Sequence, residues 1–210
     1  MDQDLNLNLD IEFAKPKRYG DYYFCKIKNK AIQFPKMKII NSNSKNMELE
    51  FINDKLYNKE VYNFLSKLDD LIVETISTNS EQWFGKSIPI DSIGSMYNKF
   101  IKAPRTSENG CSIKLDFKIR KSGLETELID KNNNSIDLDC FVVNNFAECI
   151  SQLKYIIFSK DTCYITWEIL VAKLYTPRKI KVKKYGFIPD VDDKVIHSDS
   201  DEESILSSFF

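Results

Sequence analysis

The chain has 210 residues, of which 42% are hydrophobic and 12% aromatic, and its formal net charge is −1, a composition that allows one substantial core. It contains no run of about 18 apolar residues, and its acidic, polar start (MDQDLNLNLD) is unlike a targeting signal, so we expect neither a membrane span nor secretion. Five widely spaced cysteines indicate free thiols in a reducing compartment.

The first fifty residues have the pattern of β-strands. Strict alternation of apolar and polar residues predicts a half-buried strand at residues 5–13, which Lys15-Pro16-Lys17 ends. Residues 42–46 have the composition of a turn. We also expect strands at residues 22–28, 31–34, 36–40 and 47–51.

The apolar period changes at about Asp54. Steps of three and four residues from Tyr57 to Ile76 predict an amphipathic helix of six turns, which the polar residues 77–80 end. Asp69-Asp70 is interpreted as its solvated face. A short helix with Asp91 as its N-cap follows, and residues 104–110 close this helical insertion.

The second half returns to strands. Alternation predicts one strand at residues 113–119, then a hairpin formed by residues 125–129 and 136–143, and a second hairpin formed by residues 150–158 and 162–175. The last of these strands is apolar on both faces, which indicates a central position. The fold class is therefore mainly β with a helical insertion at about 54–104: an OB-fold-like small antiparallel barrel over residues 1–188, followed by a disordered tail at 189–210.

Residues for catalysis are scarce. The single histidine, His197, lies in the acidic tail, which nearly excludes a Ser–His or Cys–His nucleophile pair on rigid elements. No two cysteines have zinc-ligand spacing. Asp137 and Asp139 share one face of a predicted strand, but nothing else supports a metal or acid–base role there. We expect a protein that is not an enzyme and has no metal or cofactor.

Basic and aromatic residues form the stronger pattern. Residues 169–188 contain six bases and no acid, and tyrosines are interleaved with them. Cations neutralise phosphates and exposed rings stack on bases, so we hypothesise a nucleic-acid site. Tyrosines on strands more often line a core, and Trp83 and Trp167 are expected to be core anchors. The candidate DNA-binding residues are Tyr22, Tyr23, Lys26, Lys28, Lys36, Lys38, Lys114, Lys118, Arg120, Tyr164, Lys173, Tyr175, Arg178, Lys179, Lys181, Lys183 and Lys184.

The C-terminal segment has the opposite charge. Residues 190–210 carry seven acids against one lysine, a net −6, so removing them from the chain's −1 leaves residues 1–189 at +5. Such a tail competes with a polyanion or docks on basic partners, and the alternative is a solvated terminus without a role. The candidate partner-docking residues are Asp199, Asp201, Glu202, Glu203, Phe209 and Phe210.

Several short segments carry a family resemblance. They are QFPKM at residues 33–37, QWFGK at 82–86, CISQLKYIIF at 149–158 and YITWEILVAKL at 164–174. In this order, and with the acidic tail, the chain resembles the single-stranded-DNA-binding proteins of nucleocytoplasmic large DNA viruses, a group similar to those of short-tailed phages. The resemblance spans about residues 19–175 and the tail.

The resemblance implies an OB-fold that binds single-stranded DNA in viral replication, recombination and repair. The tail, with Phe210 as the terminal aromatic residue, would mask the DNA groove and recruit a polymerase or helicase–primase. The expected location is the host cytoplasm at the viral replication site, or the nucleus, and a homodimer is left open. This tail is less densely acidic than the family type, which weakens the masking idea. The alternative function is a virion structural or assembly protein.

Overall fold

The structure is a computed structural model that describes residues 10–52, 56–104 and 110–176. All of these residues belong to one compact unit. The strands and helices, in chain order, are β1 (Glu12–Phe13), β2 (Lys17–Tyr19), β3 (Tyr22–Lys28), β4 (Ile32–Gln33), β5 (Met37–Ser42), β6 (Asn46–Glu50), α1 (Leu56–Phe84), α2 (Ile90–Met96), β7 (Ser112–Phe117), β8 (Ile119–Arg120), β9 (Gly123–Leu124), β10 (Glu127–Ile129), β11 (Phe146–Phe158) and β12 (Cys163–Tyr175).

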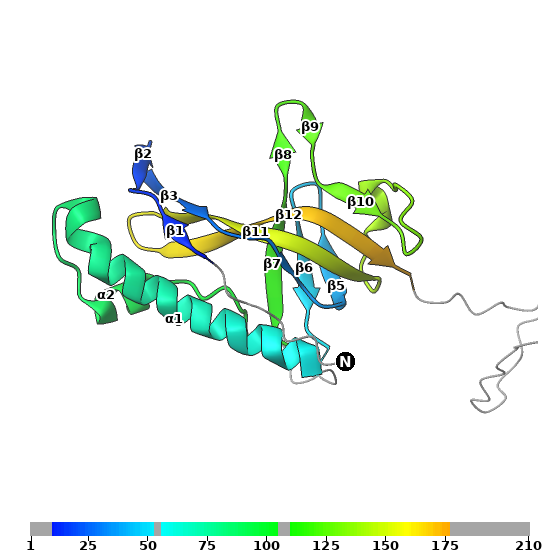
Figure 1. Cartoon of the computed structure of the whole chain (residues 1–210), viewed down its shortest axis with the longest axis horizontal. Coiled ribbons are helices and arrows are strands. Elements are labelled where there is room, and N and C mark those ends of the chain that lie inside the picture. Colours follow the sequence, from blue (N-terminus) through cyan, green and yellow to red (C-terminus); the bar gives the residue numbers. More distant parts are fainter. Residues whose placement is uncertain (1–9, 53–55, 105–109, 177–210) are drawn as a thin grey trace, which may run out of the picture. The chain divides into compact units, whose positions relative to one another are not determined.

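Five of the strands close into a ring. Along the ring, β5 pairs with β6, β6 with β7, β7 with β12, β12 with β11, and β11 returns to β5 through Phe146 and Ala147. The short strands β1–β4 and β10 extend the sheet from β11 and β12. Both helices come between β6 and β7 in chain order, and they lie outside the sheet (Figure 1). The predicted fold class, a small mainly β structure with a helical insertion, is confirmed.

Most strand pairs are antiparallel, as predicted, but two are parallel. β12 runs parallel to β7, with Glu168 opposite Asp116, and further along the same edge it runs parallel to β10, while β11 occupies its other edge. Apolar–polar alternation predicts which face of a strand is buried but not which strand is its neighbour. The predicted central position of residues 162–175 is confirmed, because β12 pairs with three strands.

α1 is longer than predicted and continues through the serine-rich stretch to Phe84. The hydroxyl of Ser80 donates to the carbonyl of Ser77 at 2.7 Å and accepts from the amide of Ile88 at 2.9 Å, so its polar group is satisfied by the helix and by the segment that follows it. The helix ends where Gly85 adopts a φ of +75°, a left-handed conformation that glycine tolerates. Along α1, Val61, Leu65, Leu68, Ile72 and Ile76 are buried in the core.

Three local predictions in the helical insertion and beyond it are wrong. α2 is preceded by Pro89 at the capping position, and Asp91 lies inside its first turn. Asp69 is buried, with 3% of its surface exposed, and only Asp70 is solvated. Residues 136–143 do not form a strand: Leu138–Cys140 is a 3-10 helix, and the expected hairpin is reduced to one bridge, Ile129 to Ser135.

The aromatic core confirms the expectation for the two tryptophans. Trp167 is fully buried, and its ring lies 5.3 Å from Phe34 and 5.6 Å from Phe100, centroid to centroid. Trp83 is 8% exposed and packs edge-on against Phe158. All five cysteines lie in the described residues and none is in a disulfide, as predicted. None of the helices described here has the length and apolar content of a membrane span.

Candidate nucleic-acid interface

Aromatic rings gather on the outer face of β2, β3 and β11. The ring of Phe24 lies at the centre, with the rings of Tyr19, Tyr22 and Tyr155 at centroid distances of 5.7, 6.4 and 5.8 Å. Tyr19 is 63% exposed and Tyr22 47% exposed, so two of these rings present much of their surface to solvent. The contacts of Tyr19 and Tyr155 with Phe24 are edge-on and that of Tyr22 is tilted, and such contacts hold neighbouring rings in defined orientations.

Tyr164 extends this group onto β12. It pairs with Ile157, and Ile157 pairs on its other side with Phe24, so the three residues form one outward-facing row across β12, β11 and β3. Burial raises the pKa of the Tyr164 phenol, and the nearby Tyr22 and Asp116 raise it further. We call Tyr19, Tyr22, Phe24, Tyr155 and Tyr164 the aromatic surface.

The two-residue period of β3 explains which of its side chains join this surface. Tyr22 and Lys26 are exposed, whereas Cys25 and Ile27 are buried. Tyr23 belongs to the inner set: it is half-buried and packs edge-on against Phe84 at the end of α1, at 5.8 Å. Of the two predicted β3 tyrosines, therefore, only Tyr22 reaches the aromatic surface.

A groove of about 520 Å³ adjoins the aromatic surface and shares Tyr155 with it. Basic side chains from three parts of the chain meet there: β3, the β8–β9 hairpin and β11. The lining residues that matter below are Lys26, Lys28, Arg120, Lys154, Tyr155 and Glu168. We call this depression the basic groove.

One carboxylate organises two of the groove's cations. Glu168 of β12 has a side chain only 2% exposed, and it accepts hydrogen bonds from Arg120 Nη1 at 3.1 Å and Nη2 at 3.5 Å. Lys154 Nζ also donates to Glu168 Oε1, and the same ammonium lies 5.7 Å from the centre of the Tyr155 ring. The carboxylate thus joins the basic groove to the aromatic surface.

The pKa values in this cluster follow from burial and pairing. Burial alone would raise the pKa of Glu168, but the hydrogen bonds from Lys154 and Arg120 outweigh it and hold that pKa below its usual value. Asp116, opposite Glu168 in the neighbouring strand, has a raised pKa because burial outweighs the attraction of Lys114 and Lys154. Glu168 is therefore the ionised partner of the cations.

Several other predicted cations are engaged in ion pairs. Lys28 Nζ lies 3.1 Å from Glu12, Lys38 Nζ lies 4.0 Å from Glu50, and Lys118 Nζ lies 3.0 Å from Glu125. Lys114 is exposed on β7 and interacts electrostatically with Asp116. These lysines remain candidates, but each already faces an acid.

Three more predicted residues lie at the opposite end of the β11–β12 ribbon. Lys36 Nζ lies over the Tyr175 ring at 4.2 Å, and the Tyr175 hydroxyl donates to Glu148 at 2.9 Å. Burial and this carboxylate raise the pKa of Tyr175 to about 12. Lys173 donates to Asn133 at 2.9 Å. This group is separate from the aromatic surface.

The remaining predicted residues lie outside the described part of the chain. They are Arg178, Lys179, Lys181, Lys183 and Lys184 in the basic stretch, and Asp199, Asp201, Glu202, Glu203, Phe209 and Phe210 in the acidic tail.

Five residues of this region were not predicted from the sequence. Phe24 could have been found, since it shares the outward period of Tyr22 on β3, and Tyr19 lies opposite Tyr22 across the β2–β3 turn. Lys154 and Tyr155 could not: a β-bulge shifts the β11 register between Leu153 and Tyr155, and alternation does not encode bulges. Glu168 was hidden because it lies in a long apolar strand. The unpredicted residues are Tyr19, Phe24, Lys154, Tyr155 and Glu168.

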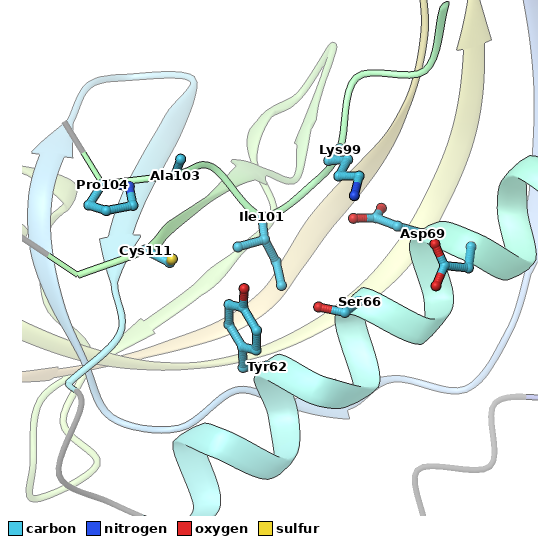
Figure 2. Close-up of a pocket in the computed structure, with 9 residues that line it drawn as sticks. Tyr62, Ser66, Asp69, Lys99, Ile101, Ala103, Pro104 and Cys111 are labelled. Carbon is cyan, nitrogen blue, oxygen red and sulfur yellow. The ribbon is translucent and has the colours of Figure 1, made fainter. Parts of the chain in front are cut away.

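A second, smaller hollow of about 230 Å³ lies between α1 and the segment before β7. Figure 2 shows Tyr62, Ser66 and Asp69 on α1 facing the segment that carries Lys99 and Ile101. Asp69 is already engaged, because it accepts hydrogen bonds from the Tyr97 hydroxyl at 2.6 Å and from a backbone amide. This carboxylate ties α1 to the α2–β7 connection and has a structural role.

Comparison with known proteins yields one family and a set of solved structures. No curated protein matches the sequence. The single-stranded DNA-binding protein from bacteriophage Enc34 matches with 11% identity and a TM-score of 0.41, over 84% of this chain and 96% of that one. The same protein in complex with ssDNA matches with 12% identity and a TM-score of 0.40, over 80% and 97%.

A second phage protein has a comparable likeness. It is gp2.5, a single-stranded DNA-binding protein encoded by bacteriophage T7, with 7% identity and a TM-score of 0.49 over 77% of this chain and 99% of that one. These values are low, so the functional interpretation rests on the side chains described above. The family match covers residues 36–189, more than half of the 210 residues. The chain therefore belongs to the family of unknown function DUF5871.

Proposed function

We propose that the protein binds single-stranded DNA without catalysing a reaction. Bases stack on the aromatic surface, and phosphates lie along the basic groove. The observation that carries this proposal is the exposure of Tyr19 and Tyr22 around Phe24, next to a groove lined by Lys26, Arg120 and Lys154. Exposed rings beside cations are what a flexible polyanion with aromatic bases requires.

The chemistry of this surface predicts weak sequence preference. Every base has a π-face, so stacking on Tyr19 and Tyr22 tolerates any sequence. The lysines and the arginine contact phosphates, which carry no sequence information. Affinity should therefore fall steeply as salt rises, and the expected site size is about 4–16 nucleotides for an OB-type barrel.

The strand order supports this location. β5, β6 and β7 form a meander, and β11 returns beside β5, which is a Greek-key arrangement in a closed five-stranded ring. OB-folds of this architecture bind oligonucleotides on the outer face of their second and third strands, here β6 and β7. The aromatic surface continues from that face through the pairing of Asp116 on β7 with Glu168 on β12.

Charge favours the β12–β11–β3 side of this face over its β6 side. Glu48 on β6 is 4% exposed and accepts hydrogen bonds from Ser112 and Lys102, and Glu50 lies near Lys38. The acids on β6 thus neutralise the nearby lysines. By contrast, Lys26 beside Tyr155 has no ion-pair partner among residues 10–52, 56–104 and 110–176.

The biological setting is proposed from the sequence resemblance. It supports a role in viral DNA replication, recombination and repair, in the host cytoplasm or nucleus. The acidic tail, through Asp199, Asp201, Glu202, Glu203, Phe209 and Phe210, would compete with DNA and dock a polymerase or helicase–primase.

The test is fluorescence anisotropy of a labelled oligo-dT at two salt concentrations. We expect nanomolar to micromolar binding that weakens steeply with salt, and a Tyr19→Ala/Tyr22→Ala variant that binds more weakly while keeping its unfolding midpoint. Failure to bind at low salt, both by the full chain and by a chain ending at Pro189, rejects the proposal. A structural or assembly role would then be preferred.

A further inference from the structure

We infer that Glu168 is a positioning residue that holds Arg120 and Lys154 side by side as a phosphate-binding pair in the basic groove. This inference rests on the proposed function and deepens it, because it assigns a specific phosphate subsite next to the aromatic surface. Glu168 itself does not contact DNA. It acts through the two cations and through the hairpin that carries Arg120.

The geometry brings three elements to one carboxylate. Arg120 comes from the β8–β9 hairpin, Lys154 from the bulge of β11, and Glu168 from the middle of β12. The bulge matters because it adds Lys154 without a partner in the ladder, so that Lys154 and Tyr155 both reach the outer face. The subsite and a stacking ring are therefore adjacent in sequence and in space.

Charge and exposure suit an anion. Two cations share one carboxylate, which leaves a surplus positive charge, and their side chains are 42% and 30% exposed while that of Glu168 is 2% exposed. A guanidinium has five N–H donors, of which Glu168 engages two, so Arg120 retains donors for a phosphate. The carboxylate orients the pair from below and leaves the outer side open to solvent.

Stability alone does not account for the arrangement. Burying a carboxylate costs free energy that its ion pairs offset only with good geometry, and apolar side chains at such a site are often as stable.

The other charged groups that face the cluster are Asp116, Lys114 and Glu125. The carboxylate of Glu125 lies 3.9 Å from Arg120 Nε. Lys118 and Lys26 belong to the same region. With these groups included, the cations Arg120, Lys154, Lys114, Lys118 and Lys26 outnumber the carboxylates of Glu168, Asp116 and Glu125.

The contact between Arg120 and Glu168 also connects the β8–β9 hairpin to the barrel. The hairpin extends beyond the end of β7 (Figure 1) and carries Arg120, which lines the groove, and Ile119 and Leu124, paired across it, are 43% and 40% exposed. Arg120 reaches from this hairpin to β12, so its contact with Glu168 joins the hairpin to β12. Loss of Glu168 should therefore disorder one wall of the subsite as well as the pair.

The test uses the full chain with Glu168→Gln and labelled oligo-dT, because charge and positioning predict opposite results. Gln removes one negative charge beside the groove, so charge alone predicts tighter binding. Positioning predicts binding about tenfold weaker. It also predicts that the slope of log affinity against log salt falls in magnitude by about one to two, because two phosphate contacts are lost.

A matched control and a second variant complete the design. Glu127→Gln removes an exposed acid on the neighbouring strand β10 and should leave affinity unchanged or slightly higher. Arg120→Lys keeps the charge on an exposed hairpin but loses the two-nitrogen contact with Glu168, so it should also bind about tenfold more weakly. Arg120→Lys keeps the inference open to rejection if Glu168→Gln does not fold.

The outcomes separate the inference from the proposed function. If the wild-type chain binds oligo-dT and a folded Glu168→Gln variant binds equally or more tightly, the positioning role is rejected while DNA binding stands. If Glu168→Gln does not fold, unchanged binding by Arg120→Lys rejects the role in the same way. If the wild-type chain does not bind at all, the proposed function fails first.

Discussion

Tyr22 and Tyr23 are consecutive residues of β3, yet their rings lie on opposite sides of the sheet. Tyr22 packs near Phe24 on the aromatic surface and is 47% exposed, whereas Tyr23 packs edge-on against Phe84 of α1. The pair provides a test and its control within two residues, since only one of the rings is available to a base.

We expect Tyr22→Ala to weaken oligo-dT binding by about 5- to 150-fold, because one stacking ring contributes about 1–3 kcal/mol. Its unfolding free energy should change little. Tyr23→Ala should lower the unfolding free energy through the lost contact with Phe84, and the folded variant should bind DNA with near wild-type affinity. Anisotropy titrations and urea unfolding measure both; a reversed pattern would place the stacking surface on the wrong side of β3.

Lys26→Ala should reduce the salt dependence of binding. Lys26 lines the basic groove and pairs in register with Tyr155, so its loss removes one phosphate contact. The slope of log affinity against log salt should fall in magnitude by about 1. Lys67→Ala, an equal charge change on the exposed face of α1, serves as the control and should leave the slope as it is. Equal effects from both lysines would indicate a diffuse charge effect.

Asp69→Ala should destabilise the fold, and Asp70→Ala should not. Asp69 accepts the hydroxyl of buried Tyr97 at 2.6 Å, and removing it leaves that hydroxyl without this acceptor. The expected loss is about 1–3 kcal/mol of unfolding free energy. Asp70 is exposed, so its substitution should change stability by within about 0.5 kcal/mol. Urea unfolding at neutral pH distinguishes the two, and similar losses would contradict a specific role for Asp69.

Asp69 should also make stability depend on pH. Burial raises its pKa above the usual value of 3.8, despite hydrogen bonds from Tyr97 and Phe100 that lower it. A raised folded-state pKa means that this contribution is fully present below the usual pKa and is lost as pH rises through the raised one. Asp69→Asn does not titrate, so its stability relative to wild type should increase as pH rises through that window. A constant difference between pH 3 and pH 8 would refute the shift.

Two glycines should respond to alanine in opposite directions. Gly85 ends α1 with a φ of +75°, where an alanine is strained by about 1–2 kcal/mol although no atom crowds its Cβ position. Gly94 lies inside α2, also uncrowded, where alanine is the better helix former by up to about 1 kcal/mol. Thermal unfolding should therefore show a lower Tm for Gly85→Ala and an equal or higher Tm for Gly94→Ala.

Much of the fold could be predicted from local patterns. The period-2 alternation at residues 22–28 and 36–40 and the hairpin formed by residues 150–158 and 162–175 became β3, β5, β11 and β12. The error at residues 136–143 arose because the apolar side chains there contact the core from a loop and a 3-10 helix, and not from a strand. The end of α1 was misplaced because the polar side chain of Ser80 finds partners in the preceding turn of the helix and in the segment after the helix, at Ile88.

The sequence by itself determined which side chains of each strand share a face, because alternation has a fixed period. Tyr22 and Tyr23 were both candidates on that basis, and only the contact of Tyr23 with Phe84 showed which of the two rings faces inward. Only the tertiary structure decided which strands meet. The parallel pairing of β7 with β12, the bulge at Lys154 and the contact of Arg120 with Glu168 each join residues distant in the chain or shift a register. Such contacts depend on ring closure, which no local pattern encodes.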